Sequence, residues 1–242
     1  MGIRKWLALL MLGSASALAE PEQLRLAVPD SAYPPYVISD ETGVHGTLIA
    51  PLRAAAAAAG IELVFTLAPE LRSHRLLQRG VIDGRMESPD WIENPDDFLW
   101  TALMLPMRDV LIYHQRHRPA KESDVALKNY EIIAHLGYAY PQLQAWFDSG
   151  QVARLDKTSE LKMLLALTNP NATRNGRAAV MERGVAQWLL KQAPELRQQP
   201  LVIGERTFGC ALMGFQLRNT ERIAELLQRL NKHSQESANH RC

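Results

Sequence analysis

The most informative stretch of this 242-residue sequence begins LRLAVPDSAYPPY at residues 24–36 and ends LLQRGVID at residues 76–83. Its start alternates apolar and polar side chains, which is typical of a strand, and the prolines that follow indicate a loop. The pattern predicts strands and helices in turn, in chain order over 24–28, 47–59, 61–65, 71–78 and from 81–82 onward. This β-α-β-α-β order predicts a parallel sheet in the first part of the chain.

A second unit of the same kind follows. Residues 103–113 are apolar enough for a long buried strand, and the charged loop 114–124, which holds Pro119, is expected to cross between lobes. Strands are then expected over residues 131–135, 152–155 and 177–181. Helices are expected over 142–148, after a cap at Thr158, and over 182–192. The last strand, 206–217, is expected to return to the first lobe, and Thr220 is expected to cap a final helix.

These elements predict an α/β protein of two lobes, each with a central sheet, joined by a hinge of two crossing segments. The first lobe is expected to comprise residues 22–113 plus 205–233, and the second residues 114–204. Residues 234–242 form a polar tail.

The N-terminus has the three parts of a secretory signal peptide. Arg4 and Lys5 precede an apolar run over residues 6–12, and small residues follow up to Ala19. The apolar run is shorter than the roughly 20 residues that span a bilayer. The expected product, cut after Ala19, is a periplasmic protein without stable membrane insertion.

The charge balance argues against nucleic acid as a partner. Twenty-seven basic and 26 acidic residues give a net charge of +1, so the chain lacks the strong positive field that holds a phosphate backbone. The two cysteines, Cys210 and Cys242, are candidates for a disulfide in an oxidising compartment, or for two free thiols or a link between chains.

Four motifs in this order resemble the family 3 extracellular solute-binding proteins, the type II periplasmic receptors for polar amino acids. They are RLAVPDSAYPPY at 25–36, GVHG at 43–46, LLQRGVID at 76–83 and GRAAVME at 176–182. The resemblance implies a ligand held in the cleft between two lobes, closure about a hinge, and capture without chemistry or a cofactor.

The resemblance also implies ligand-binding positions. Asp30 and Tyr36 lie in the loop that touches the ligand in relatives, although a turn role for Asp30 and packing against prolines for Tyr36 are the alternatives. Glu182 matches the acid that receives an α-ammonium group, and a carboxylate at the start of a helix is also stabilised by the helix dipole. Tyr138 and Tyr140 either line the cleft or pack at the edge of the lobe.

The chain departs from the family where a Thr-x-x-Arg segment normally grips the ligand carboxylate. Residues 87–97 hold several acids and no arginine, so Arg85 is the hypothetical replacement, with pairing to Glu87 or Asp83 as the alternative. The acids, beginning with Glu87, together with Trp91 indicate a second possibility beside an amino acid, namely a cationic or polyol ligand. Trp91 would cap such a ligand or fill an irregular loop.

The expected function is capture of a small polar solute for an ABC-type permease. Two alternatives are a sensor that signals to a membrane receptor such as a histidine kinase, and a cleft enzyme such as a dehydratase. The enzyme would need Glu182 to face Glu87 or Asp90. No metal site is expected, because His114 and His117 point to opposite faces of a strand.

Overall fold

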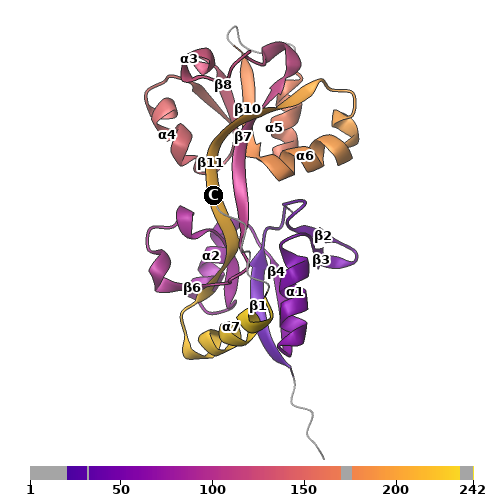
Figure 1. Cartoon of the computed structure of the whole chain (residues 1–242), viewed down its shortest axis with the longest axis vertical. Helices are drawn as coiled ribbons and strands as arrows, with labels where there is room; N and C mark the ends of the chain where they lie inside the picture. The colour runs from indigo at the N-terminus through magenta and orange to yellow at the C-terminus, as the bar shows by residue number, and fades with distance from the viewer. Residues whose placement is uncertain (1–20, 32, 170–175, 235–241) are drawn as a thin grey trace, which may run out of the picture.

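The computed structural model describes residues 21–31, 33–169, 176–234 and 242. Two lobes lie one above the other along the long axis, joined by the strands β7 (Leu105–His114) and β11 (Leu201–Arg218) (Figure 1). This arrangement confirms the predicted two-lobed α/β fold. The predicted signal peptide, residues 1–19, lies outside the described residues, within which no helix has the length and apolarity of a membrane span.

The first lobe is built on the predicted β-α-β-α-β order. Its elements are β1 (Glu22–Val28), β2 (Ile38–Asp40), β3 (Gly43–His45), α1 (Ile49–Ala58), β4 (Ile61–Leu67), α2 (Glu70–Gln78), β5 (Gly84–Glu87), the 3-10 turns η1 (Pro89–Trp91) and η2 (Pro95–Asp97), β6 (Phe98–Trp100) and α7 (Glu221–His233). Strand β1 pairs in parallel with β4 and β5, and the end of β11 pairs antiparallel with β5.

The third strand begins later than the sequence predicts. Gly80 turns the chain with φ 70°, and the Asp83 carboxylate accepts a hydrogen bond of 2.9 Å from the backbone N–H of Arg25. Residues 81–82 therefore belong to a turn, and the strand starts at Gly84.

The second lobe repeats the α/β plan. Its elements are η3 (Gln115–His117), α3 (Asp124–Leu127), β8 (Glu131–His135), α4 (Pro141–Asp148), β9 (Ala153–Lys157), α5 (Glu160–Leu167), β10 (Arg177–Glu182), α6 (Arg183–Gln192) and η4 (Pro194–Leu196). Strand β8 pairs in parallel with β9 and β10, and β7 pairs antiparallel with β10. The sheet order β4-β1-β5-β11-β7-β10-β8-β9 runs through both lobes.

The crossing between the lobes lies within strands rather than in the expected loop. Met107 packs in the core of the first lobe, whereas Val110 packs in the core of the second. The loop 114–124 lies in the second lobe, where His114 pairs with Leu201. The expected boundaries at 113/114 and 204/205 are therefore displaced by several residues, because a regular strand that crosses between lobes carries no loop composition to mark it.

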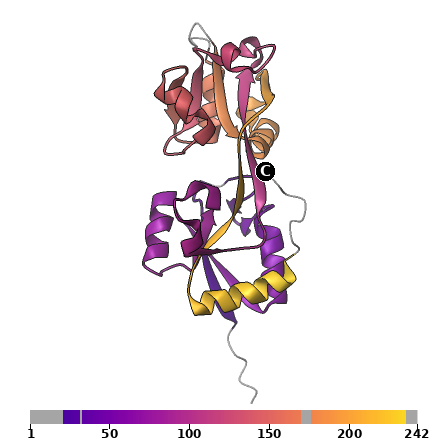
Figure 2. The same ribbon diagram turned by 60° about the vertical axis from the view of Figure 1, so that its left-hand side comes forward.

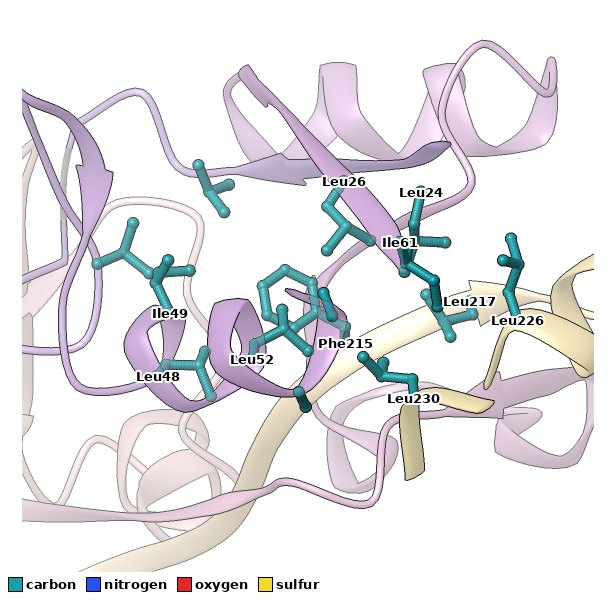
Figure 3. Packing of buried hydrophobic residues seen from close by; sticks show 14 of the residues in the cluster. Leu24, Leu26, Leu48, Ile49, Leu52, Ile61, Phe215, Leu217, Leu226 and Leu230 are labelled. Carbon is teal, nitrogen blue, oxygen red and sulfur yellow. The ribbon is translucent and has the colours of Figure 1, made fainter. Parts of the chain in front are cut away.

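Each lobe has its own apolar core. In the first lobe, side chains from β1, α1, β11 and α7 meet (Figure 3): Leu24, Leu26, Ile49, Leu52, Phe215, Leu217, Leu226 and Leu230. In the second, successive residues of β7 alternate between two clusters, one containing Val110 and the other Leu111. Burial on both faces explains the continuous apolar run of this strand. Each fully buried side chain of this size contributes roughly 1.5–3 kcal/mol.

Side-chain oxygens cap the helices close to the predicted positions. The Thr220 hydroxyl accepts a hydrogen bond of 3.4 Å from the N–H of Ile223, as expected. Helix α5 is capped by Ser159, which accepts from the N–H of Lys162 at 3.3 Å, instead of by Thr158. The helix begins one residue later than expected because Ser159 retains extended backbone angles and is an equally suitable cap.

A disulfide joins Cys210 of β11 to Cys242, with a Cα–Cα distance of 5.4 Å. It fastens the C-terminal residue beside the strands that connect the lobes (Figure 2). The bridge spans 32 residues of chain, so it restricts the unfolded state.

Reduction of this disulfide is expected to destabilise the protein by about 2 kcal/mol, the lower end of the usual range because one end is a polar tail. For a chain of this size, the melting temperature would fall by about 6 °C. Thermal unfolding with and without dithiothreitol measures the change. A double variant, Cys210→Ser with Cys242→Ser, is the control that reductant leaves unchanged, and equal melting of the reduced and oxidised wild type would contradict the prediction.

Candidate functional site

A cavity of about 230 Å³ lies between the lobes, beside the connecting strands. The first lobe supplies Asp90, Trp91 and Met107, and the second lobe supplies Asp109, Pro141 and Gln142. The remaining lining residues, Gly209, Cys210 and Ala211, belong to β11. Both ionisable residues of this lining are acids, and no lysine, arginine or histidine is among the described lining residues. The cavity wall is therefore suited to a cation or to a polar neutral molecule.

Asp109 occupies the middle of this wall. The strand register places it between Glu182 of β10 and Gly209 of β11. A Cβ atom at Gly209 would lie 3.1 Å from Oε1 of Gln142 and 3.4 Å from Oδ2 of Asp109, closer than most such contacts. The glycine thus leaves space around the Asp109 carboxylate on the cavity side.

Burial, and after it the neighbouring Glu182 carboxylate, raise the pKa of the Asp109 carboxyl from 3.8 to about 7. Within the described residues, this carboxyl has no hydrogen-bond or ion-pair partner. Two acids side by side in adjacent strands repel each other when both are ionised. The site therefore holds an acid that ionises near neutral pH and favours a cationic neighbour.

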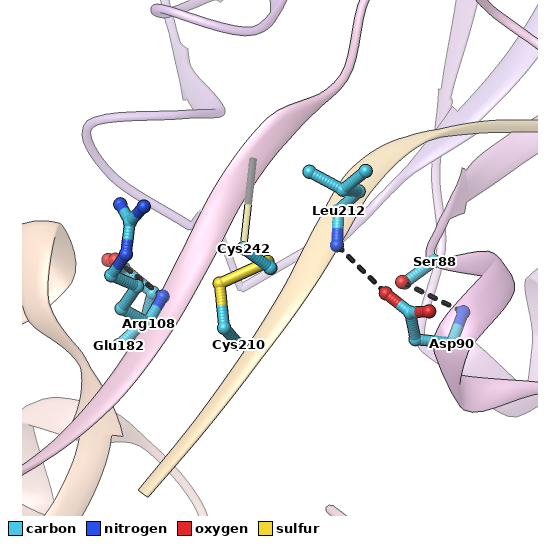
Figure 4. The surroundings of a disulfide bond; sticks show 7 residues. All are labelled: Ser88, Asp90, Arg108, Glu182, Cys210, Leu212 and Cys242. Atoms are coloured by element: carbon cyan, nitrogen blue, oxygen red, sulfur yellow. Dashed lines mark hydrogen bonds between the residues drawn. A yellow bond between two sulfur atoms is a disulfide. The ribbon is translucent and has the colours of Figure 1, made fainter. Parts of the chain in front are cut away.

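Glu182 is held by hydrogen bonds from both lobes. Its Oε2 accepts from the N–H of Val185 at 2.9 Å, which caps α6, and its Oε1 accepts from the N–H of Arg108 at 3.4 Å (Figure 4). The Tyr36 hydroxyl of the first lobe also donates to it. Burial raises the pKa of Glu182, and these hydrogen bonds oppose the rise. Both predicted residues, Tyr36 and Glu182, therefore meet at the junction of the lobes.

Tyr36 belongs to an aromatic pair that bridges the lobes. Its ring stacks on Tyr33 with a centroid distance of 5.9 Å, and both rings pack against the cores of both lobes. Burial is the main cause that raises the pKa of both hydroxyls, so both stay protonated at neutral pH. The loop between β1 and β2 thus fixes one side of the interlobe junction.

Replacement of Tyr36 by phenylalanine is expected to destabilise the protein by about 1 kcal/mol, because Glu182 loses a buried hydrogen-bond donor. The melting temperature should fall by about 3 °C. Tyr33→Phe is the matched control, because the Tyr33 hydroxyl makes no hydrogen bond with another described residue. An equal loss in both variants would mean that the Tyr36–Glu182 bond contributes nothing of its own.

The segment that carries η1 is held against β11 by hydrogen bonds. The Ser88 hydroxyl accepts from the N–H of Asp90 at 3.2 Å, and Oδ2 of Asp90 accepts from the N–H of Leu212 at 3.1 Å (Figure 4). These bonds hold η1 in place, so that Trp91, 47% exposed, lines the cavity. Contact of Trp91 with a ligand stays a prediction.

Arg85 and Glu87 form a buried pair outside the interlobe cavity. One terminal nitrogen of Arg85 bonds Glu87, and its Nε donates to Oε1 of Gln216 at 2.7 Å. Glu87 also accepts from the N–H of Ser88 at 2.9 Å, and burial raises its pKa against the opposing effect of Arg85. Arg85 lines a separate cavity of about 300 Å³ in the first lobe. The alternative of pairing with Glu87 therefore describes Arg85 better than a clamp on a ligand in the interlobe cavity.

Asp30 and Tyr138 do not line the interlobe cavity. Asp30 is an exposed residue in the turn after β1. Tyr138 stacks on His135 with a centroid distance of 4.1 Å; burial raises the pKa of its hydroxyl, and carboxylates of both lobes, Glu160, Glu70 and Glu87, add to the rise. Tyr138 thus lies at the junction of the lobes without contacting the cavity.

The most informative residue of the site, Asp109, was not predicted from the sequence, and Gln142 was assigned only to a helix. One signal for Asp109 exists, because it is the only acid within the apolar run 103–113 that predicts a buried strand. An acid in a buried strand requires a partner or a function. The sequence does not show that this acid faces a cavity, because that depends on the pairing of β7 with β11.

No protein-family model matches the sequence, and a search of curated proteins finds no match. Solved structures do match, at low identity. A histidine kinase sensor domain with similarity to periplasmic binding proteins is 18% identical with a TM-score of 0.70, covering 88% of this chain and 89% of that one. An ancestral arginine-binding protein bound to arginine is 20% identical with a TM-score of 0.66, covering 88% and 91%.

A third similar structure is the ancestral amino acid-binding protein AncCDT-1, a precursor of cyclohexadienyl dehydratase. It is 17% identical with a TM-score of 0.63, and the match covers 87% of each chain. At these identities the likeness concerns the path of the backbone. The chain therefore has the two-lobed α/β fold of the type II periplasmic binding proteins.

Proposed function

We propose that this chain captures a small polar molecule in the cavity between its lobes and performs no chemistry on it. The observation that carries the proposal is the interlobe cavity, in which Asp109, Asp90, Trp91 and Gln142 converge from both lobes. A ligand there would contact both lobes and favour their closure about β7 and β11. The amino acid-binding proteins of the same fold support this function.

A thermal-shift screen tests the proposal. Amino acids, amines, sugars and small organic acids are added one at a time to the folded protein. A ligand at one hundred times its dissociation constant adds about 2.7 kcal/mol of stability. We expect at least one class to raise the melting temperature by several degrees, and a screen without any stabilising compound would contradict the proposal.

Delivery to an ABC-type permease is the proposed role of the captured ligand, and ligand sensing is the second candidate. A specific likeness favours the second candidate, because a histidine kinase sensor domain has the same fold with a TM-score of 0.70. Deletion of the gene separates the two roles. Lost uptake of the ligand supports transport, whereas intact uptake with a lost transcriptional response supports sensing.

The enzyme alternative is less supported by the observed contacts. Glu182 is engaged by the start of α6 and by Tyr36, and Glu87 is engaged by Arg85. Incubation of the protein with each stabilising compound, followed by mass spectrometry, distinguishes capture from catalysis. Recovery of the unchanged compound is the expected result.

We also propose a periplasmic location after removal of residues 1–19. The charged start, short apolar run and small residues before the cut support it. N-terminal sequencing of the protein from a periplasmic extract should begin at Glu20. Recovery of the full-length chain from the cytoplasm would contradict this location.

A further inference from the structure

We infer that the captured ligand carries an amine or guanidinium cation and no free carboxylate, and that Asp109 receives the cation. The inference rests on the proposed function and adds the chemical class of the ligand. It also assigns the specificity of the site to a residue of β7, the strand that passes between the lobes.

The charged residues of the cavity wall indicate a cationic ligand. Its ionisable wall residues are Asp90 and Asp109, and the described lining holds no cationic side chain. Arg85 is bonded to Glu87 and Gln216 and lines the other cavity. Arg108 follows Met107 along a strand whose side chains alternate between faces, so it points away from the face of Asp109. A ligand carboxylate in this cavity would meet carboxylates without a compensating cation.

The hydrogen bonds distinguish Asp109 from Asp90. Asp90 is exposed, and its Oδ2 already accepts from the N–H of Leu212 at 3.1 Å. Asp109 is partly buried and accepts no hydrogen bond from the described residues. A partly buried carboxylate in this state gains strongly from a charged donor, because charge-assisted hydrogen bonds are roughly twice as strong as neutral ones. Asp109 is thus the acid with free acceptor capacity.

The described side chains that face Asp109 include no cationic group that could take the place of a cationic ligand. Each packed element contributes one or two facing groups, namely Glu182 from β10, Tyr33 from the loop after β1, Gln142 from α4, Asp90 and Trp91 from η1, and Gly209 from β11. These groups are acidic or neutral. A bound cation would therefore favour the ionised form of Asp109, and binding near neutral pH would release a proton.

Calorimetric titration of the wild type with matched pairs of compounds tests the class of ligand. Each pair is an amine and its parent amino acid: agmatine with arginine, cadaverine with lysine, and tyramine with tyrosine. We expect at least one amine to bind, and its parent amino acid to bind at least tenfold more weakly. An amino acid that binds as tightly as its amine, or binding of sugars or acids alone, would overturn the inference and leave the proposed function standing.

The second part of the experiment tests the residue. Asp109→Asn keeps the shape of the side chain and should lower the affinity for the bound amine at least twentyfold, whereas Asp30→Asn, at an exposed turn, should leave it unchanged. Titrations at pH 7 in phosphate and in Tris should differ in heat for the wild type because a proton is released, and should agree for Asp109→Asn. An Asp109→Asn variant with full affinity would overturn the inference. A wild type that binds no compound of any class would overturn the proposed function and the inference together.

Discussion

At pH 8 the Asp109→Asn variant without ligand is expected to be more stable than the wild type by on the order of 3 kcal/mol. Burial, and next to it the Glu182 carboxylate, raise the pKa of Asp109 from 3.8 to about 7, so its ionisation in the folded protein costs free energy. Asparagine has the same shape and stays neutral, which removes this cost. A binding residue that destabilises the free protein is a common exchange of stability for function.

The pH dependence follows from the same carboxyl. Between about pH 4 and pH 7 the folded protein holds a proton on Asp109 that the unfolded chain has lost, so the stability falls as the pH rises through this window. At pH 5 the folded aspartic acid is neutral like the asparagine, but the unfolded wild type has already lost its proton. Less than half of the difference between the variant and the wild type should therefore remain at pH 5. Glu182, whose pKa is also raised, remains in both proteins, and the difference between them therefore isolates Asp109.

Urea unfolding at pH 5 and pH 8 measures this effect, with Asp30→Asn as the exposed control. The gain of Asp109→Asn should be about 3 kcal/mol at pH 8 and less than half of that at pH 5, and Asp30→Asn should show no gain at either pH. Equal stability of this variant and the wild type at pH 8 would show that Asp109 ionises without cost, and the cavity would then be more open to water than described.

The Glu87→Ala variant is expected to lose about 3–5 kcal/mol of stability. The change leaves the Arg85 guanidinium buried without its counter-charge, with a hydrogen bond to the Gln216 side chain. Removal of one partner from a buried ion pair costs far more than the pair contributes, since the remaining charge has lost its counter-charge. Thermal unfolding should show a melting temperature lower by about 12 °C.

A double variant separates lost charge compensation from lost packing. Arg85→Met with Glu87→Leu removes both charges and keeps apolar volume, so it should recover most of the stability that Glu87→Ala loses. A Glu87→Ala variant that melts with the wild type would contradict the buried pair. In that case Arg85 would be free to serve a ligand, as the sequence had suggested.

The order of the elements was predictable because local patterns determine it. The alternating strand at 24–28, the alanine-rich helix ended by Gly60 and the Thr220 cap each require only neighbouring residues. The lobe boundary was not predictable in this way. Strand β7 runs without a break through the junction. The charged pair Arg108 and Asp109 lies between Met107 in the first core and Val110 in the second, but two charges inside a strand do not by themselves indicate a crossing between lobes.

The candidate site was predictable in part for a similar reason. Tyr36 lies in the loop after β1, Trp91 in η1 and Glu182 at the end of β10, segments where sequence motifs indicate function, and all three reach the junction of the lobes. Asp109 lies within a strand and acquires its role from Gly209, which is 100 positions later in the sequence and pairs with it. A contact at such a separation exists only in the fold. The motif at 87–97 indicated an acidic site, and the structure adds the acid from β7.

Hydrogen exchange with the tightest-binding compound of the screen tests the central claim most directly, because a ligand held between the lobes must protect segments of both. We expect slower exchange in η1 of the first lobe, at the start of α4 in the second, and around Asp109 and Gly209 in the connecting strands. Protection confined to one lobe, or centred on the other cavity beside Arg85 and Gln216, would contradict capture between the lobes.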